Sequence, residues 1–298
     1  MANSIPKNAN EFVERQLSHY LQELENELES DVLSVNGLLL FGVDDAIRKA
    51  VEERRQQPQS RQKLAVILTT AGGYIEVVQR IVHTLRHHYN VVNFIIPNYA
   101  FSAGTVLVMS GDDIYMNYYS CLGPIDPQVE TEGGQRVPAL GYLIQWERLL
   151  EKANNGTLTM AEMGLMVNGF DQAALYKYEQ ERALSIAFLE EWLVKYKFKN
   201  WKITETQQKK VTKDMRKARA KIIGEELNNT DRWHTHGYGI SMEVLRNDKN
   251  LKLLIHDFDG FPTWCAIIRS YNNLFDDYMR RRSHTGVIHT IDNYVPFM

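Results

Sequence analysis

Cysteine is scarce in this sequence, which contains only Cys121 and Cys265, far apart along the chain. Two isolated cysteines provide neither a disulfide framework nor the paired spacing of a zinc ribbon. No segment approaches the roughly 20 apolar residues that a membrane-spanning helix needs, and no apolar stretch follows a basic start. We therefore expect a soluble protein of a reducing, cytoplasmic compartment.

The sequence also lacks a strong charge bias and any nucleotide-binding fingerprint. Its 34 Lys and Arg residues nearly balance 37 Asp and Glu residues, for a net charge of −3. This balance gives no general case for binding to nucleic acid or a membrane surface, and the basic cluster at 209–221 is explained as a solvated helix face. Neither a P-loop nor a Rossmann motif occurs, and no lysine with a phosphate cradle suggests pyridoxal phosphate, so we expect no cofactor.

The centre of the chain alternates buried strands with helices. Leu64–Leu68 is a continuous run of apolar, mostly branched residues, as is typical of a strand buried on both faces. A helix is predicted from Tyr74 to His88, a second buried strand from Val91 to Ile96, a short helix to about Ser110, and a third strand at Ile114–Met116. Short connections between these segments predict an α/β fold with a parallel sheet and crossover helices.

Three segments of different character follow one another along the chain. Residues 1–30 contain an amphipathic helix, residues 31–135 hold the α/β core, and residues 136–298 are predicted to form a mostly helical extension. A loop near 228–240 holds Trp233, His234 and His236, and we expect it to return to the core. No repeat or low-complexity linker marks a sharp domain boundary.

Two glycine-bearing turns each follow a buried strand and precede a helix. Ligands bind at the carboxyl ends of parallel strands, where these turns fall. Gly72 and Gly73 can present backbone N–H groups to a developing negative charge, and Ser102 precedes the amide of Ala103 at the second turn. A nucleophilic serine and paired amide donors are what acyl transfer requires. The alternative is that Ser102 only caps its helix and the glycines only form a tight turn.

Three ordered motifs resemble one family. Thr70-Ala71-Gly72-Gly73 is similar to the S/T-P-G-G turn of Clp proteases and signal peptide peptidase A, with Ala71 in place of the usual proline. The segments at 100–105 (AFSAGT) and 120–128 (SCLGPIDPQ) resemble the nucleophile turn and the stretch after the third strand. Together they most resemble the serine dehydrogenase proteinase family, a Clp/crotonase-type branch. A looser similarity lies around 230–255.

This resemblance implies a ClpP/crotonase-like fold and a serine peptidase. Ser102 would attack the peptide carbonyl, and the amides of Gly72, Gly73 and Ala103 would hold the oxyanion. Because the scaffold is shared with other enzymes, a thioester hydrolase or hydratase and a catalytically silent scaffold remain as alternatives.

The general base is left open between two residues. Clp proteases place a histidine about two dozen residues after the serine, where this chain has Ile125-Asp126-Pro127. Signal peptide peptidases use a lysine about fifty residues after it, near Lys152. Alternatively, His236 is the base, oriented by Asp231, because the segment at 229–232 resembles the one that carries the Clp aspartate.

The resemblance also implies partners. The substrate would be a peptide or an unfolded protein, and any energy-dependent unfolding would need a separate ATPase. Clp-fold relatives assemble through their helical extensions, so we expect a homo-oligomer. Large apolar residues after Arg136 agree with such an interface, although they could equally form a helical core within a single chain. These residues are Leu140, Tyr142, Trp146, Leu149, Phe188, Leu189, Trp192, Phe198 and Trp201.

Overall fold

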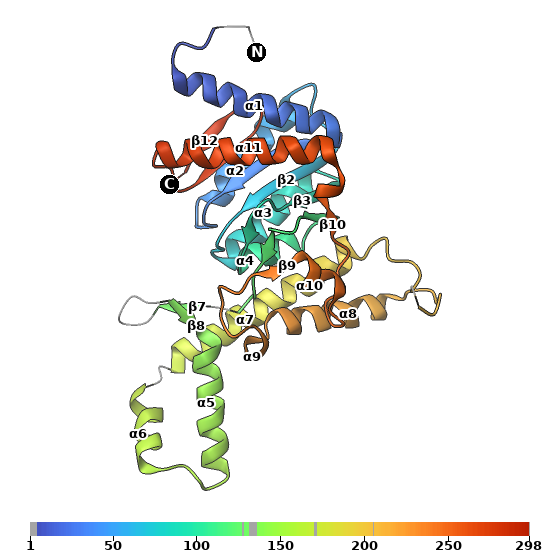
Figure 1. Ribbon diagram of the computed structural model, residues 1–298. Coiled ribbons are helices and arrows are strands. Elements are labelled where there is room, and N and C mark those ends of the chain that lie inside the picture. Colours follow the sequence, from blue (N-terminus) through green and yellow to red (C-terminus); the bar gives the residue numbers. More distant parts are fainter. Residues whose placement is uncertain (1–4, 127, 131–135, 170–171, 205, 298) are drawn as a thin grey trace.

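The computed structural model describes residues 5–126, 128–130, 136–169, 172–204 and 206–297 (Figure 1). The α-helices are α1 (Ala9–Leu28), α2 (Val43–Gln56), α3 (Ile75–His88), α4 (Ala103–Val108), α5 (Ala139–Asn154), α6 (Met160–Gly169), α7 (Gln172–Trp192), α8 (Lys213–Leu227), α9 (Thr230–Trp233), α10 (Met242–Asn247) and α11 (Pro262–Arg281). The strands are β1 (Asp31–Asn36), β2 (Lys63–Thr69), β3 (Val91–Ile95), β4 (Tyr99–Ala100), β5 (Ile114–Met116), β6 (Cys121–Leu122), β7 (Gln128–Glu130), β8 (Arg136–Pro138), β9 (Ile240–Ser241), β10 (His256–Asp257), β11 (Val287–His289) and β12 (Tyr294–Pro296).

A seven-stranded sheet in the order β10-β5-β3-β2-β1-β11-β12 forms the centre of the protein. The five strands from β10 to β1 run parallel to their neighbours, whereas β11 and β12 are antiparallel. Helices α2 and α3 connect successive parallel strands. The prediction of an α/β fold with a parallel sheet and crossover helices, followed by a mostly helical part, is therefore confirmed.

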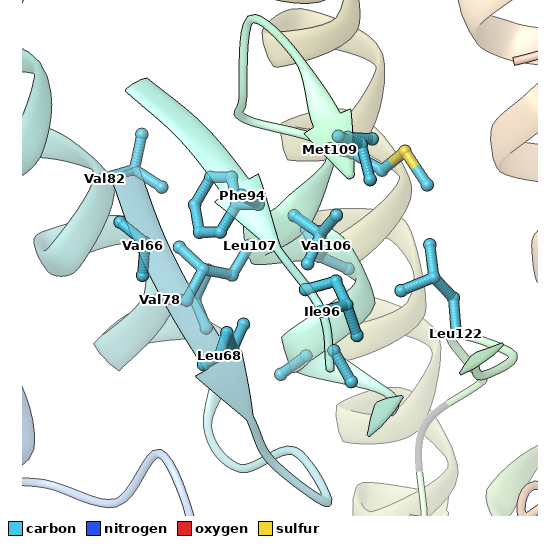
Figure 2. Close-up of a cluster of buried hydrophobic side chains, with 14 of the residues drawn as sticks. Val66, Leu68, Val78, Val82, Phe94, Ile96, Val106, Leu107, Met109 and Leu122 are labelled. Carbon is cyan, nitrogen blue, oxygen red and sulfur yellow. The ribbon is translucent and has the colours of Figure 1, made fainter. Parts of the chain in front are cut away.

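Strand β2 shows why the middle of the sheet is buried on both faces. Val66 and Leu68 point into one hydrophobic cluster, while Ala65 and Ile67 point into another on the opposite side. Successive side chains of a strand alternate between its faces, so a run without polar residues needs cover on both sides. Figure 2 shows the first cluster, in which Val66 and Leu68 lie near side chains of α3, β3 and α4.

The last forty residues of the chain return to the sheet. Strand β11 pairs with β1 in antiparallel register, with Val35 opposite Ile288, and α11 packs beside α1 over the second cluster (Figure 1). The range 136–298 is thus mostly helical but also contributes the strands β10, β11 and β12 to the sheet.

Helices α5 and α6 project from the body as an arm, and α7 leads from that arm back to the core (Figure 1). The carboxyl half of α7 is anchored by Leu189 and Trp192, which lie in the first hydrophobic cluster. Nowhere in the ranges given above is a helix both long enough and apolar enough to cross a membrane.

Candidate functional site

The Ser102 turn is held in a strained backbone conformation. Ser102 has φ 54° and ψ −123°, and α4 begins at the next residue. A non-glycine residue in this region costs on the order of 1–3 kcal/mol, and such strain collects at active sites. The surrounding structure enforces it, since Phe101 donates its N–H to the Thr70 carbonyl (2.9 Å) and the Thr70 N–H donates to the Tyr99 carbonyl (3.1 Å). A strained serine between a strand and a helix resembles the nucleophile elbow of hydrolases.

Gly72 and Gly73 have separate structural reasons to lack a side chain. A Cβ atom on Gly72, whose φ is 106°, would lie 2.8 Å from the Ser102 Cβ atom. A Cβ on Gly73 would lie 2.2 Å from the Leu39 carbonyl oxygen. The first glycine therefore allows the turn to approach Ser102, and the second allows it to pair with the segment at Leu39.

The amides of these two glycines differ in their environment. The Gly72 N–H donates to Thr70 Oγ1 at 3.0 Å. Gly73 forms a parallel bridge with Leu39. The two hydrogen bonds of this bridge involve the residues on either side of Gly73: the Leu39 N–H donates to the Gly72 carbonyl, and the Tyr74 N–H donates to the Leu39 carbonyl. In such a bridge the N–H of the central residue points away from the partner segment. Gly73 and Ala103, the latter at the unsatisfied first position of α4, are thus the better placed amide donors.

Both turns open onto a cavity of about 540 Å³. Ser102, Gly73 and Ala103 line it from the sheet side, and one face of α7 covers it. The other lining residues come from the segment before α2, the turn and start of α3, the residue before Ser102, the segment after β6, helix α7 and the loop after α9: Leu38, Leu40, Ala71, Gly72, Tyr74, Ile75, Glu76, Phe101, Ile125, Lys177, Tyr178, Glu181, Ser185, His236 and Gly237. The volume falls within the usual range for small-ligand pockets, about 300–1,000 Å³.

His236 reaches this cavity together with a buried carboxylate, Asp126. His236 Nδ1 lies 3.0 Å from Oδ1 of Asp126, and the two side chains are 9% and 1% exposed. The contact has an ion-pair distance without the alignment of a hydrogen bond. Because both side chains are buried, removing either one would leave the other without its partner.

The β6–β9 pairing explains how two residues 110 positions apart meet. These strands are antiparallel, with Leu122 opposite Ile240. Continuing this register by four residues on each strand brings Asp126 opposite His236. A backbone hydrogen bond of 3.0 Å from the Ile125 N–H to the Leu227 carbonyl also holds the residue before Asp126 against the end of α8.

The structure does not bring the other two predicted residues to this cavity. Lys152 lies on α5 in the projecting arm, half exposed, with its Nζ 2.5 Å from Oε1 of Glu162. Asp231 is exposed on α9 and is not among the cavity residues. Lys152 is therefore neither buried nor within reach of the cavity, as a base for Ser102 would have to be.

Asp126 and the α7 residues are the parts of the site that the sequence did not reveal. Asp126 occupies the place at which Clp proteases have their histidine, and that departure was the available signal. Helix α7 contributes Lys177, Glu181 and Ser185 at spacings of four residues, so they share one face. No group of three or more His, Cys, Asp or Glu side chains is arranged to hold a metal ion in the part of the chain that the structure describes.

Comparison with known proteins identifies the family. Residues 38–188, which include the Ser102 turn and the start of α7, match the family described as ClpP-like SDH-type serine proteinase. The chain belongs to this family. The predicted resemblance to Clp-type serine dehydrogenase proteinases is thereby confirmed.

Two curated relatives come from Methanocaldococcus jannaschii. The uncharacterized protein MJ0137 is 26% identical over 186 residues, which cover 56% of this chain and 62% of the relative. The uncharacterized protein MJ1495 is 31% identical over 127 residues, which cover 41% and 42%. The chain therefore spans less than two thirds of either relative.

Solved structures with a similar fold include two proteases. A mutant of the 1510-N membrane-bound stomatin-specific protease is 15% identical, with a TM-score of 0.32 over 49% of this chain and 74% of that one. A mutant of ClpP1 from Listeria monocytogenes is 14% identical, with a TM-score of 0.30 over 37% and 66%.

Proposed function

We propose that this chain is a serine peptidase that forms an acyl-enzyme at Ser102. One observation carries the proposal: Ser102 and His236 line a single cavity, and Asp126 lies 3.0 Å behind the histidine Nδ1 atom. A nucleophile, a base and a group that orients the base are the parts of a hydrolytic triad, recognised by geometry whatever their order in the chain. Membership of a serine proteinase family supports the same reaction class.

Each residue has a distinct task in the proposed reaction. Because Nδ1 of His236 faces Asp126, the other ring nitrogen, Nε2, takes the proton as Ser102 Oγ attacks the peptide carbonyl. The Gly73 and Ala103 amides donate to the oxyanion of the tetrahedral intermediate. The imidazolium then protonates the leaving amine. Water, deprotonated by His236, attacks the acyl-enzyme, and the imidazolium returns that proton to Ser102 Oγ as the second product leaves.

A fluorophosphonate probe tests the nucleophile directly. We expect the purified protein to be labelled at Ser102 and Ser102→Ala to lose both the label and hydrolysis of an unfolded protein, by at least about a thousandfold. Ser185, which also lines the cavity, provides a matched comparison, and Ser185→Ala should still be labelled. Peptide cleavage at the wild-type rate by Ser102→Ala, or labelling at Ser185, would overturn the mechanism.

We also propose that the protein works as a homo-oligomer that uses the projecting arm. Helix α6 carries Met160, Met163, Leu165 and Val167 with 83%, 48%, 61% and 74% of their surface exposed. Large apolar side chains exposed to this extent are typical of an interface. Leu189 and Trp192 contribute nothing to it, because they are buried within the chain.

Light scattering measures this assembly. We expect a mass that is a multiple of 34.5 kDa. Replacing Leu165 and Val167 with glutamate should lower the mass without unfolding the chain, because these side chains are exposed and have no core to disrupt. A mass of 34.5 kDa at every micromolar concentration would exclude the oligomer.

A further inference from the structure

The cavity that holds Ser102 also contains two carboxylates from different helices. Glu76 lies in the first turn of α3, three residues after Gly73, and Glu181 lies on the face of α7 that covers the cavity. The proposed mechanism uses neither of them. Two like charges that face one cavity repel each other, and a cation between them would relieve that repulsion.

The surroundings of the two glutamates leave them incompletely neutralised. Burial raises the pKa of Glu181, and the charge of Glu76 raises it further, whereas Lys177 lowers it. Lys177 Nζ lies 3.7 Å from Oε1 of Glu181, but 72% of the lysine side chain is exposed. An exposed pair of this kind is weak, so a better placed cation can displace the lysine. Glu76 is exposed as well, so it faces the cavity from its solvent side. Within the described ranges, no Lys or Arg side chain lies at ion-pair distance from Glu76.

The rest of the cavity suits the apolar part of a basic side chain. Leu38, Leu40 and Ile125 line it together with the ring of Phe101. Lysine and arginine bury their methylene groups against apolar surface while their charged ends remain paired. The cavity therefore combines an apolar wall with a negative pair, and both lie beside the proposed nucleophile.

We propose that the cavity selects substrates with a lysine or arginine side chain next to the scissile bond, and that Glu76 and Glu181 are the specificity-determining residues. This inference rests on the proposed peptidase function. It narrows the substrate class from any unfolded segment to basic ones.

Matched fluorogenic peptides measure the selection. They differ at one residue beside the scissile bond, which is lysine, arginine, glutamate or norleucine, an uncharged analogue of lysine. We expect kcat/KM for the lysine and arginine peptides to exceed that for norleucine by roughly ten- to a hundredfold, the range for hydrogen bonds to charged groups. Glutamate should give the slowest peptide, and added salt should narrow the ratios.

Variants assign the selection to the two glutamates. Glu181→Gln and Glu76→Gln should each reduce the lysine-to-norleucine ratio, and the double variant should bring it close to one. Glu179→Gln is the matched control, because Glu179 is an exposed glutamate on α7 that does not line the cavity. The ratio should not change in this control.

Two kinds of failure are distinguishable. If the wild-type protein cleaves the norleucine or glutamate peptide as fast as the lysine peptide, the inference is wrong and the peptidase function stands. The same holds if the double variant keeps the wild-type ratio. If no peptide is cleaved, the labelling rates of Ser102 by phosphonates with a basic or a neutral side chain provide the comparison. A protein that neither cleaves nor becomes labelled overturns the proposed function together with this inference.

Discussion

Replacement of His236 by alanine should reduce peptide hydrolysis by about a hundred- to ten-thousandfold, the usual contribution of a general base. The reason is that Ser102 then loses the imidazole that is proposed to take its proton. Hydrolysis of an unfolded substrate by the wild-type protein and by the variant measures this loss.

Asp126→Asn should reduce peptide hydrolysis about as much as His236→Ala does, although aspartate and asparagine have nearly the same shape. An amide at this position no longer stabilises the imidazolium ion, and it can favour the wrong histidine tautomer. Circular dichroism checks that the variant folds.

Asp231→Asn and Lys152→Ala are the comparison variants, since both residues were predicted from sequence and both lie away from the cavity. We expect each to keep activity within about twofold, as is usual for exposed surface positions. Loss of activity in Lys152→Ala would restore Lys152 as the base. Loss of activity in Asp231→Asn, with full activity in Asp126→Asn, would restore Asp231 as the residue that orients His236.

The fold was predictable because its signals are local. The apolar run at Leu64–Leu68 requires cover on both faces, and the two hydrophobic clusters supply it. The turns at Gly73 and Ser102 are short and follow strands directly, so their place at the carboxyl edge of the sheet followed from the parallel order. Strands β11 and β12 were not predicted: they have three residues each, and unlike the equally short β5 they do not continue a regular alternation of strands and helices.

The positions of His236, Asp126 and α7 in the site depend on contacts between distant parts of the chain, which no local sequence pattern encodes. His236 was a candidate because of its place in the chain, but its carboxylate partner was sought at Asp231, five residues away. The structure instead pairs it with Asp126 through the register of two two-residue strands, β6 and β9. The charged face of α7 reaches the cavity only because Leu189 and Trp192 dock that helix on the core.

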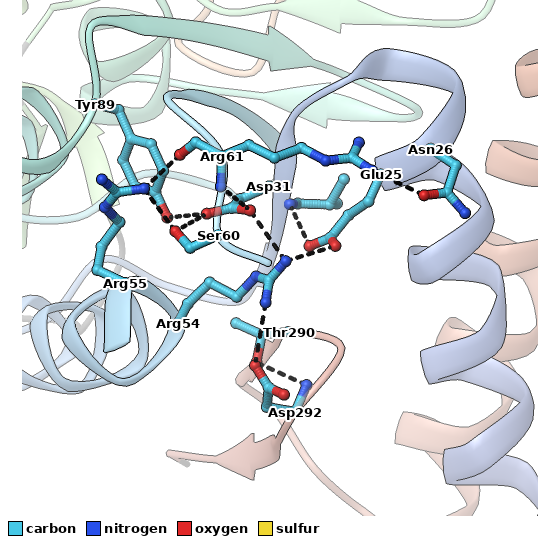
Figure 3. A network of polar contacts seen from close by, with 11 residues as sticks. Glu25, Asn26, Asp31, Arg54, Arg55, Ser60, Arg61, Tyr89, Thr290 and Asp292 are labelled. Atoms are coloured by element: carbon cyan, nitrogen blue, oxygen red, sulfur yellow. Dashed lines mark hydrogen bonds and ion pairs between the residues drawn. The ribbon is translucent and has the colours of Figure 1, made fainter. Parts of the chain in front are cut away.

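The largest effect on stability is expected at Arg54. This side chain is 2% exposed, and its Nη2 atom lies 2.8 Å from Glu25 and 3.0 Å from Asp31. Figure 3 shows the network, which joins α1, β1 and α2 to the loop after β11 through Asp292. Further donors to Asp31 are Tyr89, Ser60 and the Arg61 amide. Arg54 is therefore the cation around which several buried oxygen atoms are arranged.

Arg54→Met should lower the free energy of unfolding by about 3–5 kcal/mol at pH 8, because it leaves two buried carboxylates without their cation. Arg48→Met is the matched control on α2: its ion pairs are about 40% exposed, so a much smaller loss than that of Arg54→Met is expected. Urea unfolding followed by circular dichroism measures both variants.

The destabilisation should depend on pH in a definite direction. Burial raises the pKa of Glu25 to about 7 even though Arg54 lowers it. In the wild-type protein the Glu25 carboxyl is therefore protonated to a greater extent in the native state than in the unfolded state between about pH 4.5 and 7. The stability from this group is fully present below that window and is lost as the pH rises through it. Without Arg54 the pKa of Glu25 rises further, so Arg54→Met should lose less stability at pH 5.5 than at pH 8. Glu25→Gln should restore part of the stability of Arg54→Met at pH 8, and an equal loss at both pH values would contradict this account of the network.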